Sequence, residues 1–332
     1  MNTPATNRQY KNLALIACST QFEPSQVPQV TAILAQHGYQ VSCHYLQQNI
    51  SDLGYVDTDQ ARAHNLIKAL LDPTIDVLWF YRGGGGALNL LPYLHRYKQQ
   101  LLAIPEKMIV GFSDVTAIHG FLNNELGWRS IHGVNANNHL EMDSANQQPL
   151  PNIAALITEG IEYNNVLPLN VLAQQTASIS GMLIGGNHTL VAATFGTHYQ
   201  PDFKDKVLIL EDIGVTFRQL DRYLQQLLFL KDFNVTAIIF GQYYSTEPTD
   251  QERIMYKTVL QRFAEQYDKP VYYLPFFGHG KYNQPFILGE TVTLQRNIES
   301  VELDASEYIT LRQTPLNNEA CVWERPIVFV SE

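Results

Sequence analysis

Cysteine is scarce in this chain and never closely paired. Cys18, Cys43 and Cys321 are the only three among 332 residues, and none belongs to a C-x-x-C segment. The chain also has no H-E-x-x-H segment, so the common ligand patterns for a bound metal are missing. We therefore expect reduced thiols in a reducing compartment, no metal site and no other cofactor.

Long apolar runs and blocks of basic residues are missing as well. The first ten residues, MNTPATNRQY, are polar, and the apolar run 13–18 is too short for a signal-peptide core or a membrane span. Asp and Glu outnumber Lys and Arg by 32 to 22, which gives a net charge of −10. An acidic chain without a basic block is a poor partner for nucleic acid or an anionic membrane. We expect a cytoplasmic protein that binds neither.

The length exceeds what one hydrophobic core usually supports, so we expect two domains. Within residues 1–140, short apolar runs alternate with helical patterns. Apolar strands that alternate with helices are typical of a parallel sheet covered on both faces. We predict a Rossmann-like α/β domain here, with strands at 13–18, 39–46, 76–83 and 108–114.

The second half of the chain has a different character. The segment EMDSANQQPLPN (141–152) contains two prolines and several polar turn formers, so we assign residues 141–175 to a linker. From 176 to 332, short strands rich in glycine mix with two helical patterns, near 217–230 and 250–267. We predict a smaller C-terminal domain of the α+β or barrel-like kind.

Ser113 stands where an apolar strand ends and a helical pattern begins, in the segment I-V-G-F-S-D-V-T-A-I. This context would present the serine Oγ at the carboxyl edge of a parallel sheet, where open α/β folds place their sites. The free N–H groups of the following helix, including that of Asp114, are suited to stabilising an oxyanion. The alternative is that Ser113 or Asp114 is a helix N-cap. The segment also reads G-x-S-x-V rather than G-x-S-x-G.

Four glycines, at 83–86, follow the third predicted strand, and Arg82 precedes them. Such a run lets the backbone turn tightly and approach a ligand with its N–H groups exposed. It contains no G-K-[ST], and Leu88 breaks the G-x-G-x-x-G spacing, so neither a phosphate loop nor a dinucleotide site is indicated. The run is either a ligand-binding loop or a simple glycine-rich turn. Four glycines in a row raise the entropic cost of folding, which favours a functional role in ligand binding.

Candidate partners for a nucleophilic serine occur in the second half. Glu211 and Asp212 close the apolar strand VLIL, and His279 lies between glycines in the segment P-F-F-G-H-G. A nucleophilic serine needs a base to take its proton and a carboxylate to orient that base. Acids at strand ends are often caps, and lone histidines are often structural. The residues alone do not say which acid would serve.

Six segments, taken in order, resemble the LD-carboxypeptidase family of serine peptidases, which includes murein tetrapeptide carboxypeptidases and microcin C resistance proteins. They are R-G-G-G-G-A-L-N-L-L-P-Y-L (82–94), G-F-S-D-V-T-A-I (111–118), G-x-L-x-G-G-N (181–187), F-G-T (195–197), L-E-D-I-G (210–214) with R-x-x-D-R (218–222), and F-G-H (277–279). The resemblance implies an α/β domain that carries the serine, a second domain that carries the acid and the base, and a homodimer.

The resemblance also implies a catalytic triad of Ser113, Glu211 and His279. It implies an oxyanion hole made by the N–H of Asp114 and a glycine N–H of Gly84 or Gly85. Gly85 itself stands where many relatives carry an aromatic residue, which leaves the fine specificity open.

The function expected from this resemblance is removal of the C-terminal D-alanine from a murein tetrapeptide during peptidoglycan recycling. Arg82 would bind the free carboxylate of this small peptide substrate; alternatively, it pairs with Glu211 or Asp212. A second reading within the family is cleavage of an amide in a peptidyl-nucleotide antibiotic. A reading from another class is a non-catalytic α/β protein whose glycine loop holds an anion.

Overall fold

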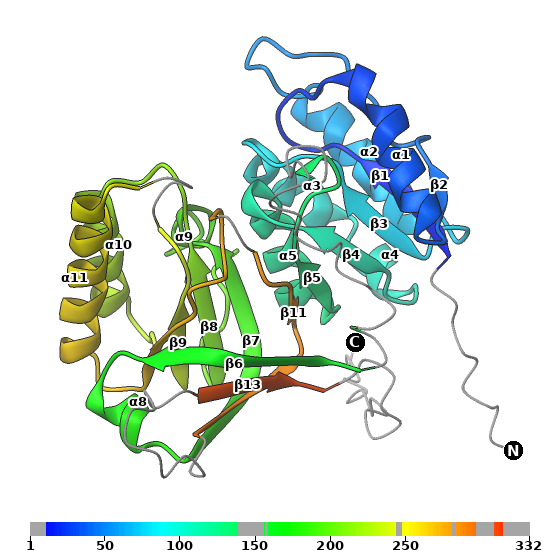
Figure 1. The fold of residues 1–332 in the computed structure, drawn as a ribbon. Helices are drawn as coiled ribbons and strands as arrows, with labels where there is room; N and C mark the ends of the chain where they lie inside the picture. Colours follow the sequence, from blue (N-terminus) through cyan, green and yellow to red (C-terminus); the bar gives the residue numbers. More distant parts are fainter. Residues whose placement is uncertain are drawn as a thin grey trace, which may run out of the picture.

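The computed structural model describes residues 11–138, 156, 159–243, 248–280, 283–296 and 309–314. Two sheets organise these residues: a six-stranded open sheet, formed mainly by the N-terminal half, and a closed seven-stranded barrel from the C-terminal half (Figure 1). The predicted combination of a parallel-sheet domain and a barrel-like domain is confirmed.

The open sheet has the strand order β11-β5-β4-β3-β1-β2, and β1 to β5 pair in parallel. Successive side chains of β1 pack on opposite faces of the sheet. Leu13 and Leu15 belong to one hydrophobic cluster, and Ala14 and Ile16 belong to another. Both faces of the sheet are therefore buried, which explains its uninterrupted apolar strands. The five strands are β1 (Asn12–Ile16), β2 (Gln40–Ser42), β3 (Val77–Phe80), β4 (Met108–Gly111) and β5 (Ser130–His132).

Helices cover both faces of the open sheet. One face packs against the first helix through Val30 and Leu34, and the opposite face packs against the other four through residues such as Leu66 and Ile118. The helices are α1 (Val27–Gln36), α2 (Asp59–Leu71), α3 (Leu91–Arg96), α4 (Lys98–Leu102) and α5 (Thr116–Leu126).

The barrel closes in the order β10-β6-β13-β12-β7-β8-β9. Its pairs β7–β8, β8–β9 and β9–β10 are parallel, and the others are antiparallel. Its strands are β6 (Ile161–Pro168), β7 (Ser178–Asn187), β8 (Lys206–Glu211), β9 (Ala237–Phe240), β10 (Val271–Tyr273), β12 (Thr291–Arg296) and β13 (Ile309–Gln313).

Two long helices lie side by side on the outside of the barrel (Figure 1). They are α10 (Phe217–Phe229) and α11 (Asp250–Gln266), and each begins with a capping box. Leu220, Leu224 and Leu227 form the buried face of α10. Two shorter helices, α8 (Val171–Gln175) and α9 (His188–Ala192), follow β6 and β7.

Two strands cross the domain boundaries expected from the sequence. β6 and α8 lie inside the range 141–175 that we assigned to a linker, yet β6 pairs with β10 and β13 as part of the barrel. Only Ile161 and Val166 of β6 are buried, and their spacing of five residues does not match the alternation expected of a strand. The range 139–155 lies outside the described residues. β11 (Phe286–Leu288), from the C-terminal half, pairs antiparallel with β5 and completes the open sheet.

One of the hydrophobic clusters extends across both domains. The cluster that contains Trp79 and Val110 of the open sheet also contains Ile287 of β11 and Leu183 and Ile209 of the barrel. None of the described helices is both long and apolar enough to cross a membrane. Cys18 is buried, Cys43 is exposed and both are free thiols, whereas Cys321 lies outside the described residues.

Candidate active site

The turn between β4 and α5 holds Ser113 in a conformation that serine rarely adopts. Its φ is 65°, in the left-handed region that is unfavourable for a residue with a Cβ. The preceding Phe112 is extended and donates its N–H to Asn135 Oδ1 at 3.2 Å. Ser113 then opens a short 3-10 turn (Ser113–Val115) that continues into α5. A strained turn from strand to helix exposes a side chain at the carboxyl edge of the sheet.

The helix-capping alternative does not describe this turn. Phe112 occupies the N-cap position of the 3-10 turn and Val115 that of α5, with no side-chain capping hydrogen bond in either case. Neither Ser113 nor Asp114 therefore serves as an N-cap.

The glycine run passes directly beside the turn that holds Ser113. At Gly83, a Cβ would lie 3.0 Å from the Cβ of Ser113 and 3.3 Å from its Oγ. Thr20, just after β1, donates its hydroxyl to the carbonyl of Gly83 at 3.1 Å. Gly84 and Gly85, the predicted oxyanion residues, come next along this loop. At Gly85 a Cβ would meet no atom closer than 3.8 Å, so the loop is open at that point.

The carboxylate of Asp114 fastens this loop to the sheet. Asp114 is buried, and its Oδ2 accepts hydrogen bonds from Ser19 Oγ at 2.6 Å and from the N–H of Ala87 at 2.9 Å. Burial raises the pKa of Asp114, although these hydrogen bonds and the charge of Arg62 oppose the rise. Asp114 thus contributes a side-chain role, bracing the end of the glycine run, that sequence analysis did not predict.

Glu211 and His279 are in direct contact. Glu211 is the last residue of β8 and is fully buried, and its Oε2 lies 2.6 Å from Nδ1 of His279. An ionised carboxylate can only accept, so Nδ1 carries the proton and Nε2 keeps a free lone pair. The His279 side chain is 13% exposed, so part of the ring is accessible to solvent.

The turn that holds Ser113 lies beside this histidine. The ring of Phe112, the residue before Ser113, packs on the ring of His279 with centroids 4.7 Å apart. Burial lowers the pKa of His279, but the charge of Glu211, its hydrogen bond and the charge of Asp212 outweigh burial and raise the pKa above its usual value.

Asp212 has different partners from those of Glu211. Its Oδ1 accepts from Asn187 Nδ2 at 2.8 Å, and its Oδ2 accepts from the N–H and the hydroxyl of Thr189 at 2.9 and 2.7 Å. Burial raises the pKa of Asp212, against the effect of these hydrogen bonds. Of the two adjacent acids, Glu211 is the one that meets the histidine.

Arg82 is exposed at the start of the glycine run and pairs with neither acid. Within the described ranges it has no hydrogen bond or ion pair, so its guanidinium is free to meet a ligand.

Two buried histidines lie behind the site. His119 donates Nε2–H to the carbonyl of Gly111 at 2.8 Å, and burial lowers its pKa to about 4. Burial also lowers the pKa of His132 well below the usual value, and the nearby His119 and His279 lower it further. Both rings are therefore uncharged near neutral pH, which leaves His279 as the histidine of this group that can take up a proton.

Sequence analysis missed Thr20, Asn135 and the carboxylate role of Asp114. Asp114 stood in the quoted segment as a possible oxyanion donor, but its partners Ser19 and Ala87 come from other strand ends, and no local pattern announces such contacts. Among the described residues, no group of three or more His, Cys, Asp and Glu side chains is arranged to hold a metal ion.

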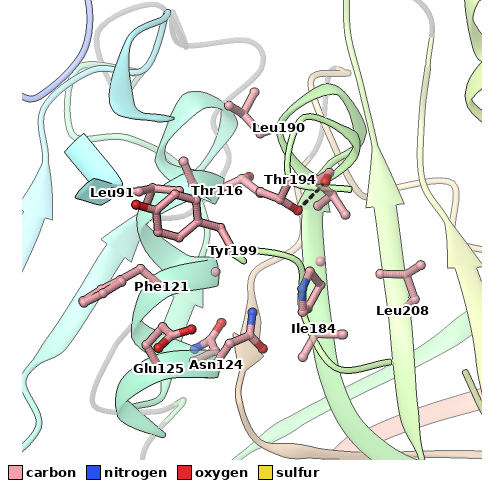
Figure 2. A pocket seen from close by; sticks show the side chains of 16 residues that line it. Leu91, Thr116, Phe121, Asn124, Glu125, Ile184, Leu190, Thr194, Tyr199 and Leu208 are labelled. Atoms are coloured by element: carbon pink, nitrogen blue, oxygen red, sulfur yellow. Dashed lines mark hydrogen bonds between the residues drawn. The ribbon is translucent and has the colours of Figure 1, made fainter. Parts of the chain in front are cut away.

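A small pocket lies between α5 and the barrel strands β7 and β8 (Figure 2). Thr116, Phe121 and Tyr199 line it from one side, and Ile184 and Leu208 from the other. Its volume is about 40 Å³, which has room for a few water molecules, since one needs about 10–15 Å³ by the same measure. It is too small to hold a peptide substrate.

Comparison with known proteins defines the class. Residues 13–133 match the N-terminal domain of LD-carboxypeptidases, and residues 180–294 match their C-terminal domain. A putative carboxypeptidase of Rickettsia conorii is 37% identical over 69% of this chain and 71% of its own length. The murein tetrapeptide carboxypeptidase of Pseudomonas aeruginosa is 28% identical over 72% of this chain and 79% of its own.

Solved structures share the fold. The muramoyltetrapeptide carboxypeptidase of Oxalobacter formigenes superposes with a TM-score of 0.74 at 21% identity, covering 91% of this chain and 98% of that one. A microcin C7 self-immunity protein, MccF, in complex with adenosine monophosphate superposes with a TM-score of 0.67 at 16% identity, covering 92% and 97%.

These matches define a hydrolase of the carboxypeptidase class. The chain belongs to the LD-carboxypeptidase family, as the six sequence segments predicted.

Proposed function

We propose that this protein is a serine carboxypeptidase that hydrolyses an L,D-peptide bond and releases the C-terminal D-alanine of a murein tetrapeptide. Ser113 is the nucleophile, His279 the base and Glu211 the residue that orients the base. The observation that carries the proposal is the 2.6 Å contact between Glu211 Oε2 and His279 Nδ1, beside the strained serine turn. The named activity of the Pseudomonas aeruginosa relative supports the substrate.

The chemistry follows from this arrangement. Ser113 Oγ attacks the carbonyl carbon of the scissile bond while His279 Nε2 takes the hydroxyl proton, and the Glu211 carboxylate stabilises the imidazolium that forms. The N–H of Asp114, with that of Gly84 or Gly85, stabilises the oxyanion. Collapse of the intermediate breaks the C–N bond, and His279 returns its proton to the leaving D-alanine amine. Water, activated by His279, then hydrolyses the acyl-enzyme.

Arg82 is proposed to bind the free carboxylate at the end of the substrate. A carboxypeptidase recognises this group close to the scissile bond, and a guanidinium binds it in bidentate fashion. The exposed position of Arg82 and its lack of a partner among the described residues support this role. The cytoplasmic location and the homodimer expected from the sequence belong to the same proposal.

Mass spectrometry of a purified murein tetrapeptide incubated with the protein tests the function. We expect a product that has lost one alanine residue, and no such product from Ser113→Ala. A tetrapeptide that stays intact under conditions in which a known relative cleaves it would contradict the assignment.

A second candidate substrate is a peptidyl-nucleotide antibiotic. This candidate is supported by the similarity of the fold to MccF in complex with adenosine monophosphate. The reaction would be an amide hydrolysis performed by the same three residues. Incubation with a synthetic aminoacyl sulfamoyl adenosine in parallel with the tetrapeptide separates the two: the preferred substrate has the higher kcat/KM.

A further inference from the structure

The groups of the proposed site belong to two different domains. Ser113 precedes α5 of the open-sheet domain, whereas Glu211 ends β8 of the barrel. Catalysis therefore depends on how these two elements are held against each other, because a misplacement of about 1 Å between reacting groups lowers the rate roughly 100-fold.

Thr116 makes a direct contact across this interface. It is the first residue of α5, three positions after Ser113, and its Oγ1 accepts the backbone N–H of Asn187 at 2.9 Å. The approach is close because Gly186 has no side chain: a Cβ there, at a φ of 124°, would lie 2.6 Å from Thr116 Oγ1. Both Thr116 and Asn187 are buried.

Asn187 continues the connection toward the catalytic acid. Its side-chain Nδ2 donates to Asp212 Oδ1 at 2.8 Å, and Asp212 adjoins Glu211 in the chain. The other carboxylate oxygen of Asp212 is held by the backbone and hydroxyl of Thr189, and its own N–H donates to the carbonyl of Gln242 at 3.0 Å. Asp212 is therefore fixed from several sides, next to the residue that orients His279.

The neighbouring part of the interface is less tightly packed. Thr116 lines the 40 Å³ pocket of Figure 2, which lies between part of α5 and part of β7 and β8. Next to this space, the hydrogen bond between Thr116 and Asn187 is a fixed point between the two elements.

We propose that Thr116, Asn187 and Asp212 form an interdomain clasp that aligns the Ser113 turn with the Glu211–His279 pair. The expected effect of the clasp on the reaction rate rests on the proposed function. Its members are positioning residues, since none touches the reacting atoms. It gives a physical reason for the segment G-G-N at 185–187: Gly186 permits the close approach, and Asn187 joins the two domains.

Thr116→Val tests the clasp, because it keeps the shape of the side chain and removes the oxygen that accepts from Asn187. We expect faster hydrogen exchange at the Asn187 amide and a loss of kcat of roughly tenfold or more, with KM within about twofold of wild type. Thr116→Ser retains the oxygen and should restore both the protection and most of the rate.

Thr194→Val is the matched control. Thr194 lines the same pocket and is buried, but its hydroxyl donates to Val191 within α9 at 2.7 Å, outside the clasp. Its kcat should stay within about twofold of wild type. The clasp is overturned if Thr116→Val leaves the Asn187 exchange rate or kcat unchanged, or if Thr194→Val lowers kcat equally.

The wild-type protein separates failure of the clasp from failure of the proposed function. If it reacts with a serine-directed phosphonate at Ser113 but leaves the tetrapeptide intact, only the substrate is wrong, and the labelling rate replaces kcat as the readout for the same variants. If it neither cleaves the tetrapeptide nor reacts with the phosphonate, the proposed function and the catalytic role of the clasp both fail.

Discussion

Gly278 lies against the carboxylate of Glu211. A Cβ at position 278 would stand 2.8 Å from Glu211 Oε2, the oxygen that accepts the Nδ1 proton of His279. The φ of Gly278 is 115°, which residues with a side chain rarely adopt. Because Gly278 has no side chain, the carboxylate of Glu211 can lie beside the backbone that leads into His279.

Gly278→Ala should accordingly disrupt the Glu211–His279 contact. We expect kcat to fall by about 100-fold, the effect of a displacement near 1 Å. Gly38→Ala is the control, since Gly38 also has a positive φ of 89° but a Cβ there would meet no atom within 4 Å. It should lower the thermal stability and leave kcat unchanged. Equal kcat values in the two variants would contradict the proposed role of the acid.

Replacement of the two adjacent acids should have unequal effects. Glu211→Gln offers His279 an amide that no longer stabilises the imidazolium, and we expect kcat to fall about 10⁴-fold. Asp212→Asn weakens the clasp and should reduce kcat only about tenfold. Steady-state kinetics on the tetrapeptide distinguishes them, and similar losses would show that the acid is wrongly assigned.

The pH dependence should reflect the raised pKa of His279. The base works in its unprotonated form, so kcat/KM should rise with pH through a midpoint above the value of about 6.5 that is usual for histidine. The charge of Asp212 contributes to the rise of this pKa, so Asp212→Asn should move the midpoint to lower pH. A wild-type midpoint below 6.5, or a shift to higher pH in the variant, would contradict this account.

Local patterns predicted the strand–turn–helix segment around Ser113 well, because an apolar strand followed at once by a helical segment occupies consecutive residues 108–126. The long-range pairings were not predictable in the same way. β11 joins the open sheet beside β5 after the chain has built most of the barrel, and three residues, Phe286–Leu288, are too short a pattern to reveal this return.

The choice between Glu211 and Asp212 required coordinates for a similar reason. Glu211 ends β8 and Asp212 follows it, and the sequence does not say which of the two side chains faces the distant His279. The family resemblance selected Glu211, and the geometry agrees. Thr116 and Asn187 are 71 residues apart, and their contact joins two domains, beyond the reach of any local pattern.

Arg82 provides a test of the substrate. If its guanidinium binds the terminal carboxylate, Arg82→Ala should lower kcat/KM on the free-acid tetrapeptide by about 10- to 100-fold, the equivalent of a charge-assisted hydrogen bond of about 1.5–3 kcal/mol. The C-terminal amide of the same peptide lacks the charge and should lose much less. Equal losses on the two peptides would show that Arg82 does not recognise the carboxylate.

Covalent labelling tests most directly whether Ser113 is the nucleophile. The protein is incubated with a serine-reactive phosphonate and digested, and the modified peptide is identified by mass spectrometry. We expect Ser113 to be the one modified residue, and tetrapeptide hydrolysis to be lost in proportion to labelling. The His279→Ala variant should be labelled more slowly than wild type. A protein that hydrolyses the tetrapeptide while Ser113 stays unmodified, or a Ser113→Ala variant with activity within tenfold of wild type, would contradict this assignment.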